Sequence, residues 1–117
     1  MSWFNVKKGE ESPERLYVLE ITVDDKVVYK VGKSSGHSSK QRMLQIIGSY
    51  FDAYRSTPVV KIVKDKVCTD VFTKETKCHQ ELAEYKFRAE KVFSGCQELF
   101  DVDKGVVLEV YKRILES

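Results

Sequence analysis

Two β-prone runs near the start of the sequence are separated by a short polar turn. Residues 16–23 (Leu-Tyr-Val-Leu-Glu-Ile-Thr-Val) and 27–31 (Val-Val-Tyr-Lys-Val) are rich in the β-branched and aromatic residues that are typical of strands. Asp24 and Asp25, which lie between the runs, are common turn residues. This pattern predicts an antiparallel hairpin, and Gly32 is expected to end its second strand.

Helical periodicity begins after the hairpin. A small polar loop at 34–39 (Ser-Ser-Gly-His-Ser-Ser) ends in hydroxyl residues that are suited to cap a helix. Apolar side chains then recur three and four positions apart, which gives one apolar helix face: Met43, Leu44, Ile46, Ile47, Tyr50, Phe51 and Tyr54. Arg42 lies in the first turn of this helix. After Pro58, the mostly apolar run 59–63 predicts a third strand.

A second helix is predicted from about Cys68 to Arg88. Its apolar side is expected to contain Val71, Phe72, Cys78, Leu82 and Tyr85. Glu75 and His79 fall on the same side, because positions 72, 75, 79 and 82 are separated by steps of three and four. A carboxylate on a core-facing stripe is costly unless a partner or a metal ion satisfies it, so Glu75 is a candidate for chemistry.

The remaining pattern completes one small domain. Residues 97–102 predict a short extended piece, and a closing helix follows with the apolar residues Val106, Val107, Val110, Tyr111, Ile114 and Leu115. The order β, β, α, β, α, short β, α predicts a small α/β (α+β) sandwich built on an antiparallel sheet. A length of 117 residues fits a single domain, which we assign to residues 15–117. Residues 1–14 are expected to form an arm that packs only through Trp3 and Phe4.

Basic residues are unevenly distributed along a chain whose net charge is only +2. The stretch 26–51 contains no Asp or Glu, and its basic residues are Lys26, Lys30, Lys33, Lys40 and Arg42. In residues 67–117, by contrast, acidic side chains outnumber basic ones. A local cationic stretch of this kind can steer a polyanion toward one face of the molecule. A solvated, lysine-rich loop is the alternative explanation.

The composition excludes several classes of protein. No apolar run approaches the roughly 20 residues that would span a bilayer, and the N-terminus lacks a secretory pattern, so we expect no membrane association. The three cysteines form an odd number with no C-x-x-C pair, which indicates a reducing compartment. They also lack zinc-finger spacing. The expected location is the cytoplasm.

Four short motifs, taken in order, resemble the GIY-YIG endonuclease superfamily. They are Leu-Tyr-Val at 16–18, Tyr-Lys-Val-Gly-Lys-Ser at 29–34, Arg42 in the next helix and Glu75 in a later one. The second motif is most similar to the phage and bacterial branch that has Lys-Ile-Gly. That branch also carries Glu-x-x-x-His and Glu-x-Phe, which are found here at 75–79 and 98–100. The resemblance covers about residues 15–103 and implies a three-stranded antiparallel sheet sandwiched by helices.

The resemblance also implies a role for each matching residue in phosphodiester hydrolysis. Tyr17 would hold or deprotonate the attacking water, and Lys30 would lower the pKa of Tyr17 or contact phosphate. Arg42 would present its planar fork of donors to the scissile phosphate. Glu75 would hold the cofactor, a divalent cation that we expect to be Mg²⁺ or Mn²⁺.

Neighbouring positions on a strand face opposite sides of a sheet, so only one of Tyr29 and Lys30 can line such a site. When the second motif is aligned on Gly32, Lys30 takes the position of the motif's tyrosine. Lys30 is therefore favoured, and Tyr29 would then pack under a helix. Lys33, Lys40 and His37 are expected to contact nucleic acid.

Three further residues have expected supporting roles. His79 is expected to brace Glu75 or the sheet edge, with a proton-transfer role as the alternative, and Glu98 to be a structural residue at a strand end. The late Asn of the superfamily has no counterpart, and Gln97 is the candidate to replace it.

The sequence, with this resemblance, therefore predicts a metal-dependent endonuclease that hydrolyses phosphodiester bonds in DNA, encoded by a phage or a mobile element. If a phage encodes it, the expected location is the host cytoplasm. Its expected partner is duplex DNA. Because no DNA-recognition module accompanies the domain, low sequence specificity is expected, or specificity gained by forming a homodimer. The alternative is a catalytically inactive module on the same fold that binds nucleic acid or a host protein. Convergence of Tyr17, Arg42 and Glu75 on one cleft would distinguish the nuclease from the binding module.

Overall fold

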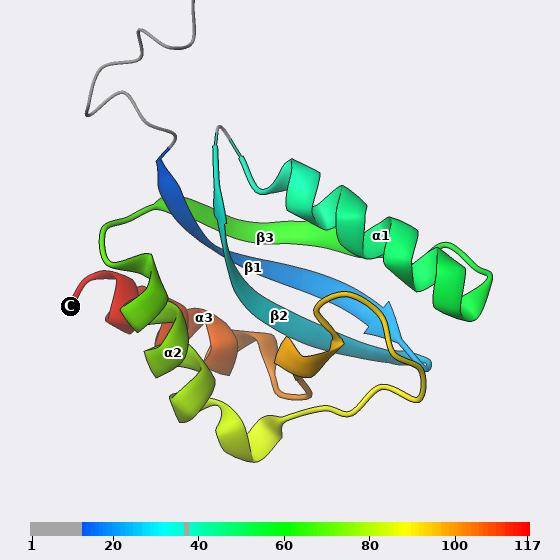
Figure 1. Cartoon of the computed structure of the whole chain (residues 1–117). Coiled ribbons are helices and arrows are strands. Elements are labelled where there is room, and N and C mark those ends of the chain that lie inside the picture. Colours follow the sequence, from blue (N-terminus) through cyan, green and yellow to red (C-terminus); the bar gives the residue numbers. More distant parts are fainter. Residues whose placement is uncertain (1–12, 37) are drawn as a thin grey trace, which may run out of the picture.

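A four-stranded antiparallel sheet forms the centre of the molecule, as seen in a computed structural model that describes residues 13–36 and 38–117 (Figure 1). The strands lie in the order β3-β1-β2-β4. Their bounds are β1 (Glu14–Val23), β2 (Lys26–Ser35), β3 (Val60–Val67) and β4 (Leu99–Phe100). The helices are α1 (Lys40–Tyr54), α2 (Val71–Glu81) and α3 (Lys104–Leu115), with short 3-10 helices η2 (Ala83–Tyr85) and η3 (Cys96–Glu98). The predicted arm at 1–14 lies almost entirely outside the described residues.

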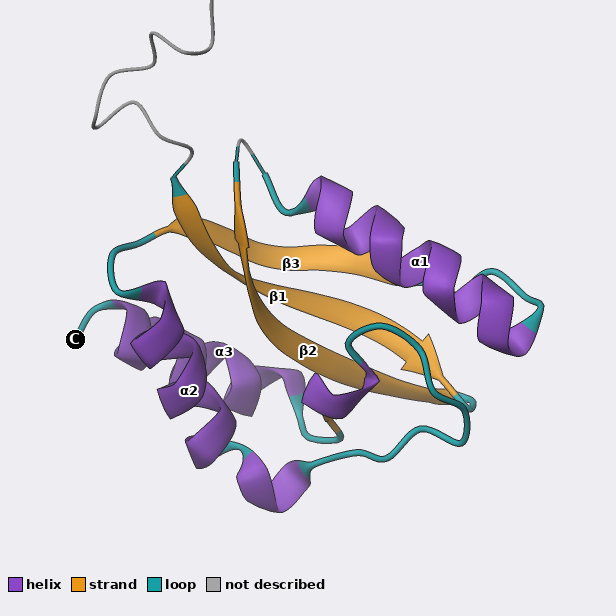
Figure 2. Cartoon of the chain, in the orientation of Figure 1, coloured by secondary structure: helices purple, strands orange, loops and turns teal. Residues whose placement is uncertain are grey.

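Helices cover both faces of the sheet, as the prediction of an α+β sandwich requires (Figure 2). Alternate residues of β1 point to opposite sides. Leu16 and Val18 pack with α2 and α3, whereas Tyr17 and Leu19 pack with α1. Each face therefore has its own hydrophobic cluster. None of the described helices has the length and apolar character needed to cross a membrane.

The sheet differs from the prediction in the number of its strands. The expected three-stranded sheet is wrong, because the short extended piece near residue 100 pairs with the outer edge of β2. Only Tyr29 and Lys30 of β2 are matched by β4, through Phe100 and Leu99. β4 therefore does not cover the β2 edge between Lys30 and Ser35, and side chains from other elements can approach that edge.

The hairpin is longer than its β-prone runs. β2 does not end at Gly32 but continues to Ser35, and Gly32 pairs with Tyr17 of β1. The predicted turn is confirmed, because Asp24 and Asp25 both have positive φ values of 51° and 65°. Two successive left-handed residues fit the right-handed twist of the flanking strands.

The buried stripe of α2 runs through positions 71, 75, 78 and 82. Glu75 lies on this stripe and is 8% exposed, as expected for a carboxylate on the core-facing side. Phe72 was predicted to share that side, but it lies beside the stripe and is 68% exposed. The helix also ends at Glu81, well before the predicted Arg88.

Candidate active site at the β2 edge

Tyr17 and Lys30 form a hydrogen-bonded pair on the face of the sheet that α1 covers. Tyr17 pairs with Gly32 across the hairpin, so Lys30, two residues earlier on β2, shares its face. The Lys30 ammonium group donates a hydrogen bond of 2.8 Å to the Tyr17 hydroxyl oxygen. Tyr29 points to the other face and donates to Glu20 at 3.1 Å. Lys30, and not Tyr29, therefore lies beside Tyr17.

Gly32 makes room for this pair. A Cβ atom at position 32 would lie 2.5 Å from the Tyr17 hydroxyl oxygen and 2.6 Å from its Cζ, and it would also collide with the Lys30 nitrogen. The absence of a side chain, and not backbone flexibility, is what this position requires. The Gly of the second motif is thus explained by close approach of the Tyr17 ring.

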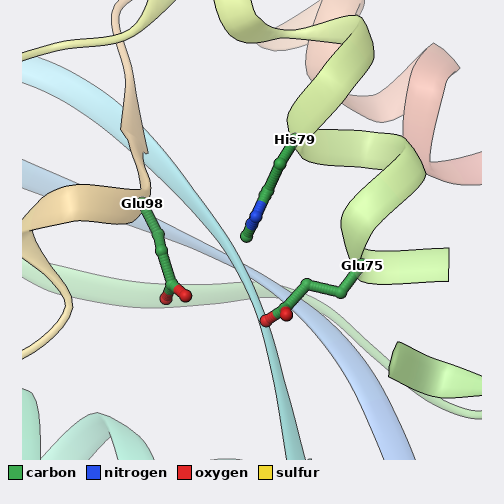
Figure 3. Close-up of side chains that lie close together, drawn as sticks. All are labelled: Glu75, His79 and Glu98. Atoms are coloured by element: carbon green, nitrogen blue, oxygen red, sulfur yellow. The ribbon is translucent and has the colours of Figure 1, made fainter. Parts of the chain in front are cut away.

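Three potential metal ligands converge at the free edge of β2. Glu75 and His79 come from α2, and Glu98 comes from η3 on the other side of the strand (Figure 3). Their ligand atoms all lie within 4.8 Å of one another. Glu98 was expected to be a structural strand-end residue, and the structure instead brings it into this cluster. The Glu-x-Phe motif was the sequence signal for it.

Glu98 connects the cluster to the Tyr17–Lys30 pair. One of its carboxylate oxygens lies 2.8 Å from the Lys30 ammonium nitrogen. Lys30 is only 2% exposed, so this ion pair and the Tyr17 hydrogen bond satisfy a buried charge. Among the described residues, no ion pair or side-chain hydrogen bond engages Glu75, so its carboxylate is the free acceptor of the cluster.

His79 braces the strand edge through its Nε2 atom, which lies 2.7 Å from the Val31 carbonyl oxygen. A carbonyl oxygen can only accept a hydrogen bond, so Nε2 carries the proton. In the neutral ring, Nδ1 then keeps its lone pair for a metal ion or a proton. The neighbouring Cys78 is not an equivalent ligand, because burial raises the pKa of its thiol to about 12.

Arg42 reaches the site from the first turn of α1. Its Nη1 atom donates to the Ser94 hydroxyl oxygen at 3.0 Å and to Gln45 Oε1 at 3.2 Å. Arg42 lines a groove of about 300 Å³ together with Glu98, and the exposed Gln97 also lines it. Tyr17 is absent from this lining, because it is fully buried. Of the metal-ligand cluster, Glu98 lines this groove but Glu75 does not, so Tyr17, Arg42 and Glu75 do not line one groove. Glu98 is the residue that connects the Arg42 groove to the cluster.

A polar network that the sequence did not reveal fixes the loop before α1. Asp65 of β3 accepts hydrogen bonds from the Arg15 guanidinium at 2.7 Å, from the Ser39 backbone at 2.8 Å and from the Ser39 hydroxyl at 3.1 Å. Burial alone would raise the pKa of Asp65, but the hydrogen bonds from Arg15 and Ser39 outweigh it and lower that pKa. Ser39 precedes α1 as expected, although its hydroxyl bonds to Asp65 and does not cap the helix.

Two of the three residues expected to contact nucleic acid lie in described elements, Lys33 in β2 and Lys40 at the start of α1. Lys33 and Lys40 are both exposed, and the Lys33 ammonium lies 5.9 Å from the centre of the Phe72 ring. His37 lies outside the described residues. The two lysines are available to a ligand, and the structure does not place them in contact with the metal-ligand cluster.

Comparison with known proteins gives one match. A family model described as the T5orf172 domain matches residues 14–115, which includes all the residues of the site. This family is associated with GIY-YIG-like and HNH-like phage nuclease domains, which suggests a nuclease or DNA-binding role. Searches of curated proteins and of solved structures found no match.

Proposed function

The chain belongs to the T5orf172 domain family, and we propose that it is a divalent-metal-dependent DNA endonuclease of the GIY-YIG kind, encoded by a phage or a mobile element. One observation carries the proposal. Two carboxylates and an imidazole meet within 4.8 Å, directly beside a lysine that is hydrogen-bonded to a tyrosine. Phosphodiester hydrolysis needs a polarised water, positive charge near the non-bridging oxygens and a proton path, and these residue types can supply all three.

The donor set of the cluster suits a hard divalent cation. Glu75 is mostly buried and has no cationic partner among the described side chains, so a metal ion would compensate its charge. Carboxylate oxygens are preferred by Mg²⁺ and Mn²⁺, and Glu75 would hold the ion with Glu98 and His79 beside it. When bound, such an ion polarises a phosphoryl oxygen or lowers the pKa of a water molecule.

The other residues are assigned the roles that the superfamily resemblance implies. Lys30 would hold the Tyr17 hydroxyl through its hydrogen bond and would add positive charge beside the substrate phosphate. Tyr17 is the group that would hold or deprotonate the attacking water. Arg42 uses Nη1 to contact the protein, and no described residue engages its Nε or Nη2, so that side of the fork remains for two phosphate oxygens.

A second candidate function is a nucleic-acid-binding module without catalytic activity. The observation that favours it is the burial of Tyr17, which is 0% exposed, and of Lys30, which is sealed by Glu98. In this arrangement the Tyr17 hydroxyl reaches no solvent. The nuclease therefore requires that substrate phosphate compete with Glu98 for Lys30, whereas the binding module requires no such exchange.

A plasmid assay separates the two functions. Supercoiled DNA is incubated with the protein in Mg²⁺, in Mn²⁺ and in EDTA, and nicked and linear products are measured. The nuclease predicts cleavage that needs the metal and is abolished in Glu75→Gln, because the near-isosteric amide keeps the fold but cannot replace the carboxylate. Glu109→Gln, at an exposed position on α3, is the matched control and should cleave like the wild type. Equal cleavage by wild type and Glu75→Gln would refute the metal role, and DNA binding without any cleavage would favour the binding module.

A further inference from the structure

We propose that a basic groove along residues 86–97 binds the phosphate backbone of DNA and leads it to the active site. The inference rests on the proposed function in taking DNA as the ligand, but, apart from Gln97, it concerns residues to which the superfamily resemblance gives no role. The segment connects α2 to β4 and crosses the face of the sheet that α1 covers (Figure 1).

The groove is continuous with the site. It has a volume of about 530 Å³ and is lined by Lys86, Phe87, Arg88, Ala89, Lys91, Val92, Cys96 and Gln97. Three of these residues, Val92, Cys96 and Gln97, also line the smaller groove that contains Arg42 and Glu98. A strand lying in the larger groove would therefore pass next to the Arg42 guanidinium and to Glu98, which is the member of the metal-ligand cluster that lines the smaller groove.

Positive charge dominates this groove. Lys86, Arg88 and Lys91 are exposed, and none of them forms an ion pair with another described residue. Glu90 is the acidic residue of the segment, and it does not line the groove. Cations of this kind at a groove wall are suited to phosphate, whose binding releases condensed counterions from DNA. An apolar protein partner is a poorer fit, because Val92 is the one strongly exposed aliphatic side chain among the described residues of the lining.

The segment that carries these cations is held firmly. Phe93 is 4% exposed, and its ring packs edge-on against Tyr50, with centroids 5.2 Å apart. The Phe87 backbone donates to the Leu99 carbonyl oxygen at 2.8 Å, and the Lys91 backbone donates to the Tyr54 hydroxyl at 3.2 Å. A surface fixed in this way loses little conformational entropy when DNA binds.

The test is the salt dependence of DNA binding, measured in EDTA so that no cleavage occurs. A labelled duplex is titrated by fluorescence anisotropy over a series of salt concentrations. The triple variant Lys86→Gln, Arg88→Gln, Lys91→Gln should flatten the slope of log Kobs against log salt by about two to three, because each neutralised phosphate contributes about 0.9. A circular dichroism melt checks that the variant is folded.

A matched control removes the same charge elsewhere. Lys64, Lys66 and Lys112 are exposed and line a separate groove between β3 and α3, and none forms an ion pair with a described residue. Their triple glutamine variant changes the net charge equally, and its slope should differ from that of the wild type by less than about one. Equal flattening by both variants would overturn the proposal, because general attraction to the whole protein would then explain the binding.

The outcome is independent of the proposed catalysis. If the wild type nicks plasmid in Mg²⁺ but the Lys86, Arg88, Lys91 triple variant keeps the wild-type salt slope, DNA binding by the groove is refuted and the proposed nuclease activity stands. If the wild type does not nick plasmid, and only the Lys86, Arg88, Lys91 triple variant flattens the salt slope, nuclease activity is refuted and DNA binding by the groove stands.

Discussion

A methyl group added at position 32 should damage both the fold and the site, and its cost can be worked from the structure. The new Cβ would lie 2.5 Å from the Tyr17 hydroxyl oxygen, whereas atoms in ordinary contact are about 3.5–4.0 Å apart. The Tyr17 ring cannot move outward, because it is fully buried between the sheet and the α1 cluster. Overpacking of this kind costs about 1–3 kcal/mol.

Two further effects accompany the collision in Gly32→Ala. Separating Tyr17 from the Lys30 ammonium weakens a hydrogen bond to a charged group, which is worth about 1.5–3 kcal/mol. Alanine recovers about 0.5–1 kcal/mol, since it has less conformational freedom than glycine in the unfolded chain. The net expectation is a loss of about 2–4 kcal/mol, a large part of the roughly 5–15 kcal/mol that typically stabilises a domain.

Urea unfolding measures this loss, and a second glycine provides the control. With a slope of about 2 kcal/mol per molar urea, the middle of the usual range, the midpoint for Gly32→Ala should fall by about 1–2 M. Gly48 lies in α1, and a methyl group added there would meet no atom of another element within 4 Å, so Gly48→Ala should instead gain about 0.5–1 kcal/mol. If both variants are as stable as the wild type or more so, the close approach of Tyr17 and Lys30 to Gly32 is refuted.

Two further predictions concern the polar contacts that hold the site in place. Asp65 has a lowered pKa in the folded state, so its contribution to stability is complete above its unfolded pKa near 3.8 and is lost as pH falls through the folded value. Asp65→Asn should therefore be less stable than the wild type at about pH 5, and the gap in urea midpoints should narrow toward about pH 2; a constant gap contradicts this. Ser94→Ala should slow cleavage roughly threefold to tenfold at unchanged DNA affinity, because Arg42 loses one of its two acceptors. In an Arg42→Lys background the same change should have little further effect, and additive losses would exclude the coupling.

Local pattern was sufficient to predict the parts of the site that depend on one element. Alternation along β2 separated Tyr29 from Lys30, and helical spacing placed Glu75 on the buried side of α2. Phe72 shows the limit of the same argument, because two adjacent positions can satisfy similar spacing while only one lies on the buried stripe. The burial of a helix position depends on the angle at which the helix packs, which the sequence pattern leaves open.

Contacts between distant segments were beyond the reach of local pattern. Glu98 comes close to Glu75 because it immediately precedes β4, whose first residue, Leu99, pairs with Lys30 of β2. A two-residue strand has too short a run to show periodicity. Asp65 lies between two lysines on a strand, so its partners Arg15 and Ser39 could not be inferred from its neighbours. The basic groove was hidden for a related reason, since it lies in a half of the chain where acidic residues outnumber basic ones.

The short length of β4 explains how one site can draw on both layers of the fold. Side chains on opposite faces of a continuous sheet are separated by the sheet itself, so Lys30 on the α1 face and Glu75 on the α2 face would ordinarily not share a partner. Because β4 begins only at Leu99, opposite Lys30, the β2 edge beyond Lys30 is uncovered, and Glu98, just before β4, can contact Lys30 while its carboxylate lies within 4.8 Å of the Glu75 carboxylate. The edge of β2 is thus the place where the ammonium group of one face and a carboxylate of the other lie close together, as the proposed nuclease requires.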